Sequence, residues 1–381
     1  MTQIFQIQKK CTKTMARTGM VNLPHGSVQT PVFMPIGTQG SVKSLSVQDL
    51  HNLDAQIILG NTYHLWLRPD IEVIKNANGL HNFISWDRPI LTDSGGFQAF
   101  SLSKIRKFSE DGVTFRSQLN GEKRFLSPEI SMQIQTTIGS DIALVLDECL
   151  EAEVDEKRAK SAMLRTRRWA ERSKKEWDRL HENSSSNGLR HLLFGIPQGA
   201  QFENLRIESA KLTMELGFPG YSIGGVANGG EPEEIMYSQV HAQTQILEDN
   251  KPRHLLGVGK PKDLVQMVAR GIDMFDCVYP TRNARHGSLL YKLDETTYTT
   301  ERIVGGKFKF DFSAINPNSK IIELRTYSKA YLRHLFVTKE LLGMRLATLH
   351  NLEFYLDLMQ NVRTKINNDS FKDWWQDYRE V

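Results

Sequence analysis

A chain of 381 residues, with 40% hydrophobic and 24% charged residues, has enough apolar material for one large α/β barrel with an appendage, or for two domains. The formal net charge of +4 is small for this length, so a nucleic-acid site would be a local basic patch and not a uniformly basic surface. Three widely separated cysteines argue against a disulfide framework, and no signal peptide or apolar run of about 18 residues is found, so we expect a cytoplasmic protein without a membrane span.

Short apolar runs that end in polar residues recur along the chain. After turn-rich strands between 16 and 35 and a helix at 46–53, they fall at 56–59, 90–92, 142–146, 192–196, 220–223, 254–256 and 272–278. This alternation predicts parallel strands joined by helices, and a closed (β/α)8 TIM barrel is the economical solution, with a doubly wound open sheet as the alternative. We predict a barrel domain over residues 1–300 and a small C-terminal helical subdomain over 301–381.

The run at 90–92 is followed by Asp93, Ser94, Gly95, Gly96 and Phe97. Two adjacent glycines let backbone amides approach a ligand, the carboxylate lies at a strand end, and the aromatic ring offers a flat face on which a base can stack. Taken alone, this motif is more often a tight turn with a capping Asp.

Two further polar residues follow predicted strands. Asp147 comes after 142–146, where it could accept hydrogen bonds from the N1–H and the exocyclic amine of a guanine-like base, and Gln198 could contact the opposite edge. A helix-capping Asp and a loop Gln are the alternative. The glycine-rich segment 224–231 fits a loop whose backbone faces a ligand.

Positive charge is concentrated in three places. A long charged helix between 151 and 188 is interpreted as a solvated helix on the outside of the barrel and not as an RNA site. Lys260, in GVGKPKD, could bind a phosphate. Arg282 and Arg285 lie in a predicted glycine-ended loop directly after a strand whose only charges are Asp273 and Asp276. A strand-end carboxylate beside clustered guanidiniums suggests covalent or acid–base chemistry on a phosphate-bearing substrate, against a capping Asp with a solvated loop.

The segment DMFDCVYPTRNARHG resembles the signature of the tRNA-guanine transglycosylases, enzymes that exchange a guanine base in tRNA for a 7-deazaguanine. DSGGFQ, GGVANGGE and GVGKPKD also match motifs of that family, and the resemblance covers nearly the whole chain. It implies a double displacement, in which Asp276 is the nucleophile that forms a covalent ester with RNA and Asp93 is the general acid/base.

The resemblance further implies exchange at wobble position 34 of the GUN-anticodon tRNAs for Asp, Asn, His and Tyr, in queuosine biosynthesis. The implied base-binding residues are Asp93, Ser94, Gly95, Gly96, Phe97, Asp147, Gln198, Gly225 and Leu256. The implied contacts with the anticodon loop are Gly257, Val258, Gly259, Lys260, Pro261, Lys262, Asp263, Thr281, Arg282, Asn283, Ala284 and Arg285. One inserted residue near Asn228 leaves open whether the base is 7-aminomethyl-7-deazaguanine or queuine, and a homodimer is implied as well.

The C-terminal part departs from the family. Members carry C-x-C-x-x-C and a later histidine, which bind structural zinc, whereas this chain has Ser319, Ile321 and Leu324 at the cysteine positions and retains only His350. We predict a metal-free subdomain in which Ile321 and Leu324 are buried in place of the metal, and no cofactor.

Three other functions are weighed against this one. An archaeosine-type enzyme is disfavoured because the chain lacks the additional C-terminal RNA-binding domains of that group. A noncatalytic tRNA-binding partner subunit of a heterodimer is disfavoured because Asp93 and Asp276 are both present. A metal-dependent barrel hydrolase would need ligands such as His64 and Asp147, but no metal-binding spacing supports it.

Overall fold

The computed structural model describes residues 3–101, 106–150, 154–182, 189–226 and 232–381. Short parallel strands form two sheets at its centre. One sheet has the order β12 (Leu192–Phe194), β11 (Ile142–Leu144), β7 (Ile90–Thr92), β6 (Ile58–Gly60) and β5 (Ile36–Gly37); the other has the order β13 (Tyr221–Ile223), β14 (Arg253–Leu255), β15 (Met274–Asp276) and β4 (Val32–Met34). Every pairing within these sheets is parallel, which confirms the predicted α/β class.

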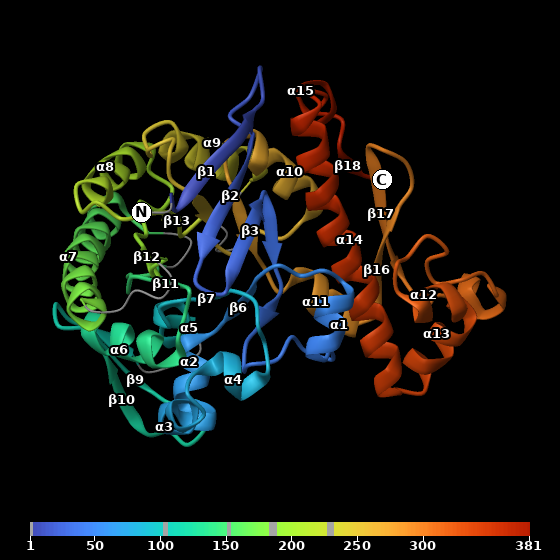
Figure 1. Ribbon diagram of the computed structural model, residues 1–381, viewed down its shortest axis with the longest axis horizontal. Coiled ribbons are helices and arrows are strands. Elements are labelled where there is room, and N and C mark those ends of the chain that lie inside the picture. The colour runs from blue at the N-terminus through green and yellow to red at the C-terminus, as the bar shows by residue number, and fades with distance from the viewer. Residues whose placement is uncertain (1–2, 102–105, 151–153, 183–188, 227–231) are drawn as a thin grey trace.

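Helices follow most of these strands and pack around the outside of the sheets (Figure 1). They are α1 (Val47–Asn52), α2 (Thr62–Leu65), α3 (Ile71–Asn76), α4 (Leu80–Ile84), α5 (Gly96–Ser101), α6 (Pro128–Ile138), α7 (Glu156–His181), α8 (Glu203–Met214), α9 (Glu233–Thr244), α10 (Pro261–Ala269) and α11 (Tyr279–Arg285), with a π-helical turn at Trp66–Asp70. Helix α7 shows why they pack this way: it buries Trp169 and Trp177 against the core and keeps its charges outside.

Two antiparallel sheets flank the parallel strands. The first, β1 (Phe5–Lys10), β2 (Arg17–Leu23) and β3 (Gly26–Thr30), lies across them near the N-terminus (Figure 1). The second consists of β8 (Arg106–Phe108), β9 (Val113–Arg116) and β10 (Lys123–Leu126). The first sheet is tied to the centre by Arg17, whose guanidinium binds both carboxylate oxygens of Asp273 at 2.9 and 2.6 Å.

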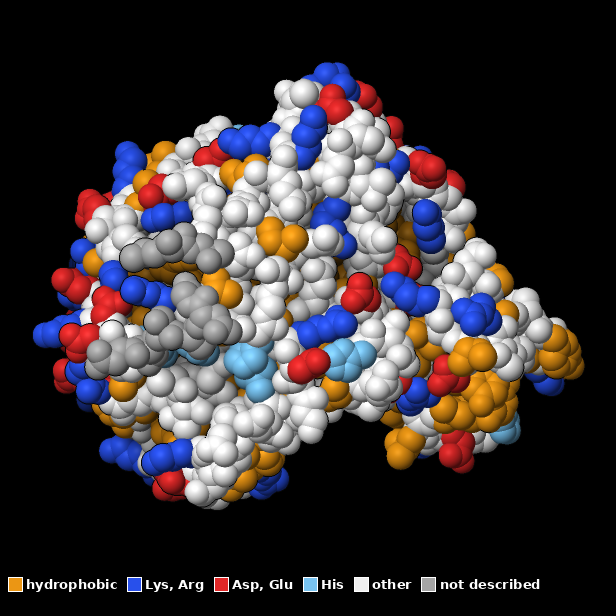
Figure 2. Space-filling model, viewed as in Figure 1, with side chains coloured by type: hydrophobic (Ala, Val, Ile, Leu, Met, Phe, Trp, Pro, Cys, Tyr) orange, Lys and Arg blue, Asp and Glu red, His pale blue; other side chains and the backbone are white. Residues whose placement is uncertain are grey.

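The C-terminal region consists of β16 (Ser288–Lys292), β17 (Thr297–Arg302), a 3-10 turn at Gly306–Phe310, α12 (Ile322–Thr326), α13 (Lys329–Val337), α14 (Leu341–Asn367), α15 (Phe371–Trp374) and β18 (Arg379–Glu380). Helix α14 stands between the parallel strands and the elements after β17 (Figure 1) and buries Leu346, Leu349 and Tyr355. Hydrophobic side chains gather on the outer surface of this region (Figure 2).

One local prediction is wrong. Residues 279–285, expected as a cationic loop with Arg282 and Arg285, form helix α11. Pro280 lies in its first turn, where the fixed proline φ favours a helix, and Gly287 follows its end at φ +77°. Within the described ranges, no helix is both long and apolar enough to cross a membrane.

Candidate active site

Three carboxylates meet at the C-terminal ends of the parallel strands. Asp93 directly follows β7, Asp147 comes three residues after β11, and Asp276 is the last residue of β15. Parallel strands present these ends at one edge, so side chains far apart in the sequence come together there. Asp147 and Asp276 are 5% and 7% exposed, and the charge of Asp276 acts on Asp93.

The carboxylate of Asp93 is held by the start of helix α2. The Asn61 side-chain amide donates to one oxygen and the Thr62 backbone N–H donates to the other at 2.9 Å. Burial raises the pKa of Asp93 to about 7, the bond from Thr62 opposes this rise, and the charge of Asp276 adds to it. A carboxyl with this pKa exists in both protonation states near neutral pH, which suits acid–base chemistry. Sequence reasoning missed Asn61 and Thr62, although polar residues after a strand were their signal.

The carboxylate of Asp147 accepts hydrogen bonds from uncharged side chains. The amide of Gln198 donates at 2.6 Å to one oxygen, and the hydroxyl of Ser94 donates at 3.2 Å to the other. Burial raises the pKa of Asp147, and the Gln198 bond partly opposes that rise. Burial also raises the pKa of the Cys149 thiol, with the charge of Asp147 as the next cause, so this cysteine stays protonated and is a poor nucleophile.

Glycine is required at two positions where the backbone lies close to Asp147 and Gln198. A Cβ at Gly225, which has φ +68°, would lie 2.4 Å from the Gln198 side-chain oxygen, and one at Gly96 would lie 2.9 Å from the Asp147 carbonyl oxygen. The Arg206 guanidinium binds the Gly225 carbonyl at 2.5 Å, which fixes this turn. The inserted residue near Asn228 lies outside the described residues.

The two hydrophobic residues assigned to the base site differ in exposure. Phe97, on α5, is 49% exposed, and Leu256, directly after β14, is half-buried. A half-exposed aromatic ring beside a carboxylate cluster is available for stacking on a ligand.

Asp276 accepts two hydrogen bonds from the neighbouring strand and its loop. Nε2 of His254 lies 2.8 Å from its Oδ1, and the Gly257 backbone N–H donates to the same oxygen at 3.3 Å. Sequence reasoning missed His254, and its signal was a polar residue inside an apolar strand.

The residues assigned to RNA divide by exposure. Those with exposed or half-buried surface are Gly257, Lys260, Lys262, Arg282, Asn283 and Arg285, and those that are buried are Val258, Gly259, Pro261, Asp263, Thr281 and Ala284. Lys260 and Lys262 both pair with Glu233, at 3.2 and 2.7 Å, while Asp263 accepts a hydrogen bond from Tyr237 at 2.6 Å. The cations among these residues with exposed or half-buried surface are therefore Lys260, Lys262, Arg282 and Arg285, and Glu233 pairs with the first two.

The four positions that bind zinc in the family do not fit a metal here. Ile321 and Leu324 are 5% and 0% exposed, as predicted. His350 is 4% exposed, its Nε2 lies 2.8 Å from the Leu290 carbonyl oxygen, and burial lowers its pKa to about 4. One neutral imidazole among a hydroxyl and two alkyl side chains offers a single zinc ligand, whereas a structural site takes four.

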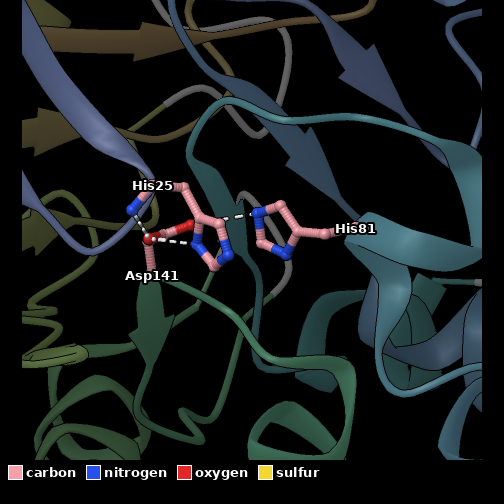
Figure 3. A group of neighbouring side chains, drawn as sticks. All are labelled: His25, His81 and Asp141. Carbon is pink, nitrogen blue, oxygen red and sulfur yellow. Dashed lines mark hydrogen bonds and ion pairs between the residues drawn. The ribbon is translucent and has the colours of Figure 1, made fainter. Parts of the chain in front are cut away.

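A second polar cluster lies near the opposite ends of the strands. His25 Nδ1 and His81 Nε2 lie 2.9 and 3.3 Å from the two oxygens of Asp141, which precedes β11, and the two rings stack at 3.6 Å (Figure 3). The Ile90 backbone N–H also donates to Asp141, at 2.9 Å. Among the described residues this is the only trio of His, Cys, Asp or Glu groups close enough to share a metal ion, so the site carboxylates form no such trio with His64. We interpret this cluster as a structural ion pair with a buried carboxylate and a partly exposed His25, which joins the β2–β3 turn to the central sheet.

A cavity of about 590 Å³ opens between residues 12–15, helix α9 and the end of α10. Arg270 lies in it, 4.6 Å above the ring of Tyr237. None of the three strand-end carboxylates lines it, so we place the chemistry at the carboxylates, where the perturbed groups converge.

Comparison with known proteins identifies the family. A family model described as queuine tRNA-ribosyltransferase matches residues 11–381. The chain is 49% identical to a queuine tRNA-ribosyltransferase of Neisseria gonorrhoeae, over 99% of this chain and 97% of the relative. It is 48% identical to that of Francisella tularensis subsp. novicida, over 98% and 97%, and 47% identical to that of Lysinibacillus sphaericus, over 99% and 95%. The chain therefore belongs to the queuine tRNA-ribosyltransferase family of transferases.

Proposed function

We propose that this protein is a tRNA-guanine transglycosylase that exchanges guanine at position 34 of GUN-anticodon tRNAs for a 7-deazaguanine in queuosine biosynthesis. The observation that carries the proposal is a pair of neighbouring strand-end carboxyls in different environments, Asp93 with a pKa of about 7 and Asp276 bound by two N–H donors. Family membership supports tRNA as the substrate.

In the first half of the proposed reaction, a carboxylate oxygen of Asp276 forms a bond to C1′ of the ribose while the C1′–N9 bond breaks. The electron pair of that bond leaves with guanine, and Asp93 in its protonated form supplies a proton to the departing base. A covalent aspartyl–RNA ester results. The guanosine must leave its stack to reach carboxylates that are buried to this degree.

In the second half, Asp93 is a carboxylate and takes the proton from N9 of the incoming 7-deazaguanine. That nitrogen attacks C1′, the ester C–O bond breaks, and Asp276 recovers its negative charge. Two displacements retain the configuration at C1′. A pKa of about 7 supports both duties of Asp93, because the group gives and takes a proton at little cost near neutral pH.

For the base, we propose that Asp147 accepts the N1–H and the exocyclic amine of guanine, while Gln198 and the backbone at Gly225 contact the other edge. Phe97 and Leu256 would sandwich the ring. The buried position of Asp147 supports this assignment, since its carboxylate is held by the uncharged donors Ser94 and Gln198 and retains acceptor capacity for ligand N–H groups. The incoming base is 7-aminomethyl-7-deazaguanine in the first instance, with queuine as the alternative.

For the RNA, we propose that the exposed cations after β14 and β15 bind the anticodon-loop phosphates. Lys260, Arg282 and Arg285 carry this role, and the rest of 257–263 and 281–285 shapes the surface. A local patch of this kind agrees with the small net charge of +4.

We further propose that residues 1–300 form a closed (β/α)8 barrel and that 301–381 form a metal-free subdomain. Two contacts support closure: Pro35 alone separates β4 from β5, which belong to different sheets, and a parallel bridge joins Gly195 to Tyr221 between β12 and β13. The single ligand that His350 offers supports the absence of zinc, and we propose no cofactor.

We also propose a cytoplasmic homodimer. Its support is a group of exposed apolar side chains on the C-terminal subdomain (Figure 2), with exposed fractions of 73% for Phe310, 75% for Phe312, 64% for Ile322, 55% for Val337 and 77% for Leu341. A patch of this kind is typical of a protein interface. Analytical ultracentrifugation of the wild type and Leu341→Lys tests it, and a monomeric wild type would contradict it.

Incubation with a GUN-anticodon tRNA and radiolabelled guanine tests the proposed function. The wild type is expected to incorporate label, and Asp276→Ala to incorporate none while its thermal unfolding stays cooperative. A folded wild type that incorporates no label but binds the tRNA would instead support a noncatalytic partner subunit.

A further inference from the structure

The nucleophile of the proposed reaction belongs to a chain of three buried side chains from adjacent strands. Ser222 on β13, His254 on β14 and Asp276 on β15 are linked, because β14 pairs in parallel with both neighbours and Ser222 is the direct partner of His254. Ser222 and His254 are each 0% exposed. Burial of two polar side chains in an otherwise apolar sheet is unfavourable unless they are hydrogen-bonded, and here they bond to each other and to the carboxylate.

The contacts determine which nitrogen of His254 carries the proton. Nε2 lies 2.8 Å from Asp276 Oδ1, and Nδ1 lies 3.0 Å from the Ser222 hydroxyl. An ionised carboxylate only accepts hydrogen bonds, so Nε2 must be the donor. In the neutral ring Nδ1 is then an acceptor, which the serine hydroxyl satisfies. Asp276 therefore fixes the tautomer, and the Ser222 hydroxyl holds the ring in place by donating to Nδ1.

The two carboxylate oxygens of Asp276 differ in the hydrogen bonds that they accept. Oδ1 accepts from His254 and from the Gly257 backbone N–H, at 2.8 and 3.3 Å. Among the described residues, no donor contacts Oδ2. A carboxylate held through one oxygen keeps a fixed plane, and its second oxygen remains the better nucleophile because no hydrogen bond withdraws its electrons.

We propose that His254 is a positioning residue for the nucleophile: with its ring held in place by Ser222, it donates to Oδ1 of Asp276 so that Oδ2 attacks the ribose. This inference rests on the proposed function. When Oδ2 bonds to C1′, the electron pair of the C1′–N9 bond leaves with guanine as described above, and the His254 hydrogen bond stays on Oδ1, now the ester carbonyl oxygen. When the ester breaks, negative charge returns to the carboxylate and the same bond stabilises it.

Four single variants test the proposal. His254→Ala removes the donor, His254→Gln restores an N–H in a side chain of similar reach, and Ser222→Ala removes the hydroxyl that holds the ring through Nδ1. His350→Gln is the matched control, because it changes another buried histidine that hydrogen-bonds a backbone carbonyl in the C-terminal subdomain. Each is examined for its melting temperature, its tRNA affinity by filter binding, and the single-turnover rate of a covalent enzyme–tRNA complex that survives denaturation.

A positioning role predicts a loss of rate without a loss of binding. For His254→Ala we expect the complex to form roughly 30- to 100-fold more slowly, since a small misplacement of a reacting group has effects of that size. The tRNA Kd should stay within about twofold, so that steady-state kcat falls and KM does not. His254→Gln should form the complex about tenfold faster than His254→Ala. Ser222→Ala should form it a few-fold more slowly than the wild type, and His350→Gln at the wild-type rate.

Two results overturn the inference. One is formation of the complex by folded His254→Ala at the wild-type rate. The other is an equal loss in His254→Ala and His254→Gln, which would mean that the ring packs the core and its N–H is irrelevant. If His254→Ala does not fold, a loss of about 30-fold or more in folded His254→Gln overturns the inference, because the restored N–H should keep the loss below that. A wild type that forms no complex at all would refute the proposed function itself, so the two failures are distinguishable.

Discussion

The two ends of the parallel strands hold buried carboxylates in opposite electrostatic situations. At the N-terminal ends, Asp273 binds the guanidinium of Arg17, and Asp141 contacts two stacked imidazoles; burial acts to raise the pKa of Asp141, but its hydrogen bonds with the imidazoles lower it overall. At the C-terminal ends, no Lys or Arg of the described chain pairs with Asp93, Asp147 or Asp276, and burial raises the pKa of the first two. Carboxylates paired with a guanidinium or with two imidazoles hold the fold together, whereas those at the C-terminal ends, of which Asp276 contacts the single imidazole of His254, are available for a substrate.

The largest effect on stability is expected from Arg17→Met. It leaves the carboxylate of Asp273, which is 0% exposed, without its partner, and breaking a buried pair in this way costs about 3–5 kcal/mol. Urea unfolding measures the loss. Lys13→Met is the matched control, because the Lys13 to Asp373 pair is 64% exposed on both sides and should contribute less than about 1 kcal/mol. Equal losses of unfolding free energy in the two variants would show that the buried ion pair contributes no more to stability than the exposed one.

Asp147→Asn is expected to lower the activity and to leave the stability nearly unchanged. An amide cannot accept both N–H groups of guanine, so kcat/KM for guanine exchange should fall by about 10²-fold or more. The melting temperature should change little, because the Asn oxygen can still accept from Gln198 and the Asn amide can donate to the Ser94 hydroxyl oxygen. Exchange at the wild-type level would remove Asp147 from base recognition.

Asp93→Asn is expected to change how stability depends on pH. The folded pKa of Asp93 is raised, so its favourable contribution is complete below the unfolded value of about 4 and is lost as the pH rises toward 7. The variant has no such loss. Its free energy of unfolding relative to the wild type should therefore be more favourable at pH 8 than at pH 5, by about 2–3 kcal/mol. A difference that is the same at both pH values would show that the raised pKa is incorrect.

His25→Ala should have a smaller effect with the same sign of pH dependence. The hydrogen bond to Asp141 raises the pKa of His25, although burial opposes it, so the contribution is complete below about 6.5 and is lost as the pH passes the raised value. Because the side chain is 36% exposed, we expect no more than about 1 kcal/mol. Melting temperatures at pH 6 and pH 9 measure it, and a wild-type advantage that grows with pH would contradict the assignment.

A chelator is expected to have no effect. Protein purified without added zinc should keep its melting temperature and activity after prolonged EDTA treatment, because the cysteine positions hold Ser319, Ile321 and Leu324. Elemental analysis is the second measurement. One equivalent of zinc that resists the chelator would refute the metal-free subdomain.

The sequence was sufficient to predict that Asp93 and Asp276 belong to strand ends. Asp93 follows a short apolar run and Asp276 lies within one, and such runs can be recognised because buried parallel strands are continuously hydrophobic. The strand bounds were less well predicted, since β11 and β15 cover three residues each of the longer apolar runs.

What the sequence could not provide are contacts between distant segments. Arg17 meets Asp273 across 256 positions, and the role of His254 depends on its neighbours in the sheet, so neither has a local pattern. Helix α11 was missed for a different reason. A loop was predicted directly after the strand, although a proline such as Pro280 also starts helices.

The central claim is that, among the three carboxylates at the C-terminal ends of the parallel strands, Asp276 is the one that forms a covalent bond to RNA. The most direct measurement is mass spectrometry of the covalent enzyme–tRNA complex, trapped by denaturation and digested with nuclease and protease. The account predicts a guanine-free ribonucleotide remnant on the peptide that contains Asp276. A remnant on any other residue, or label exchange by an enzyme that forms no covalent complex, would contradict it.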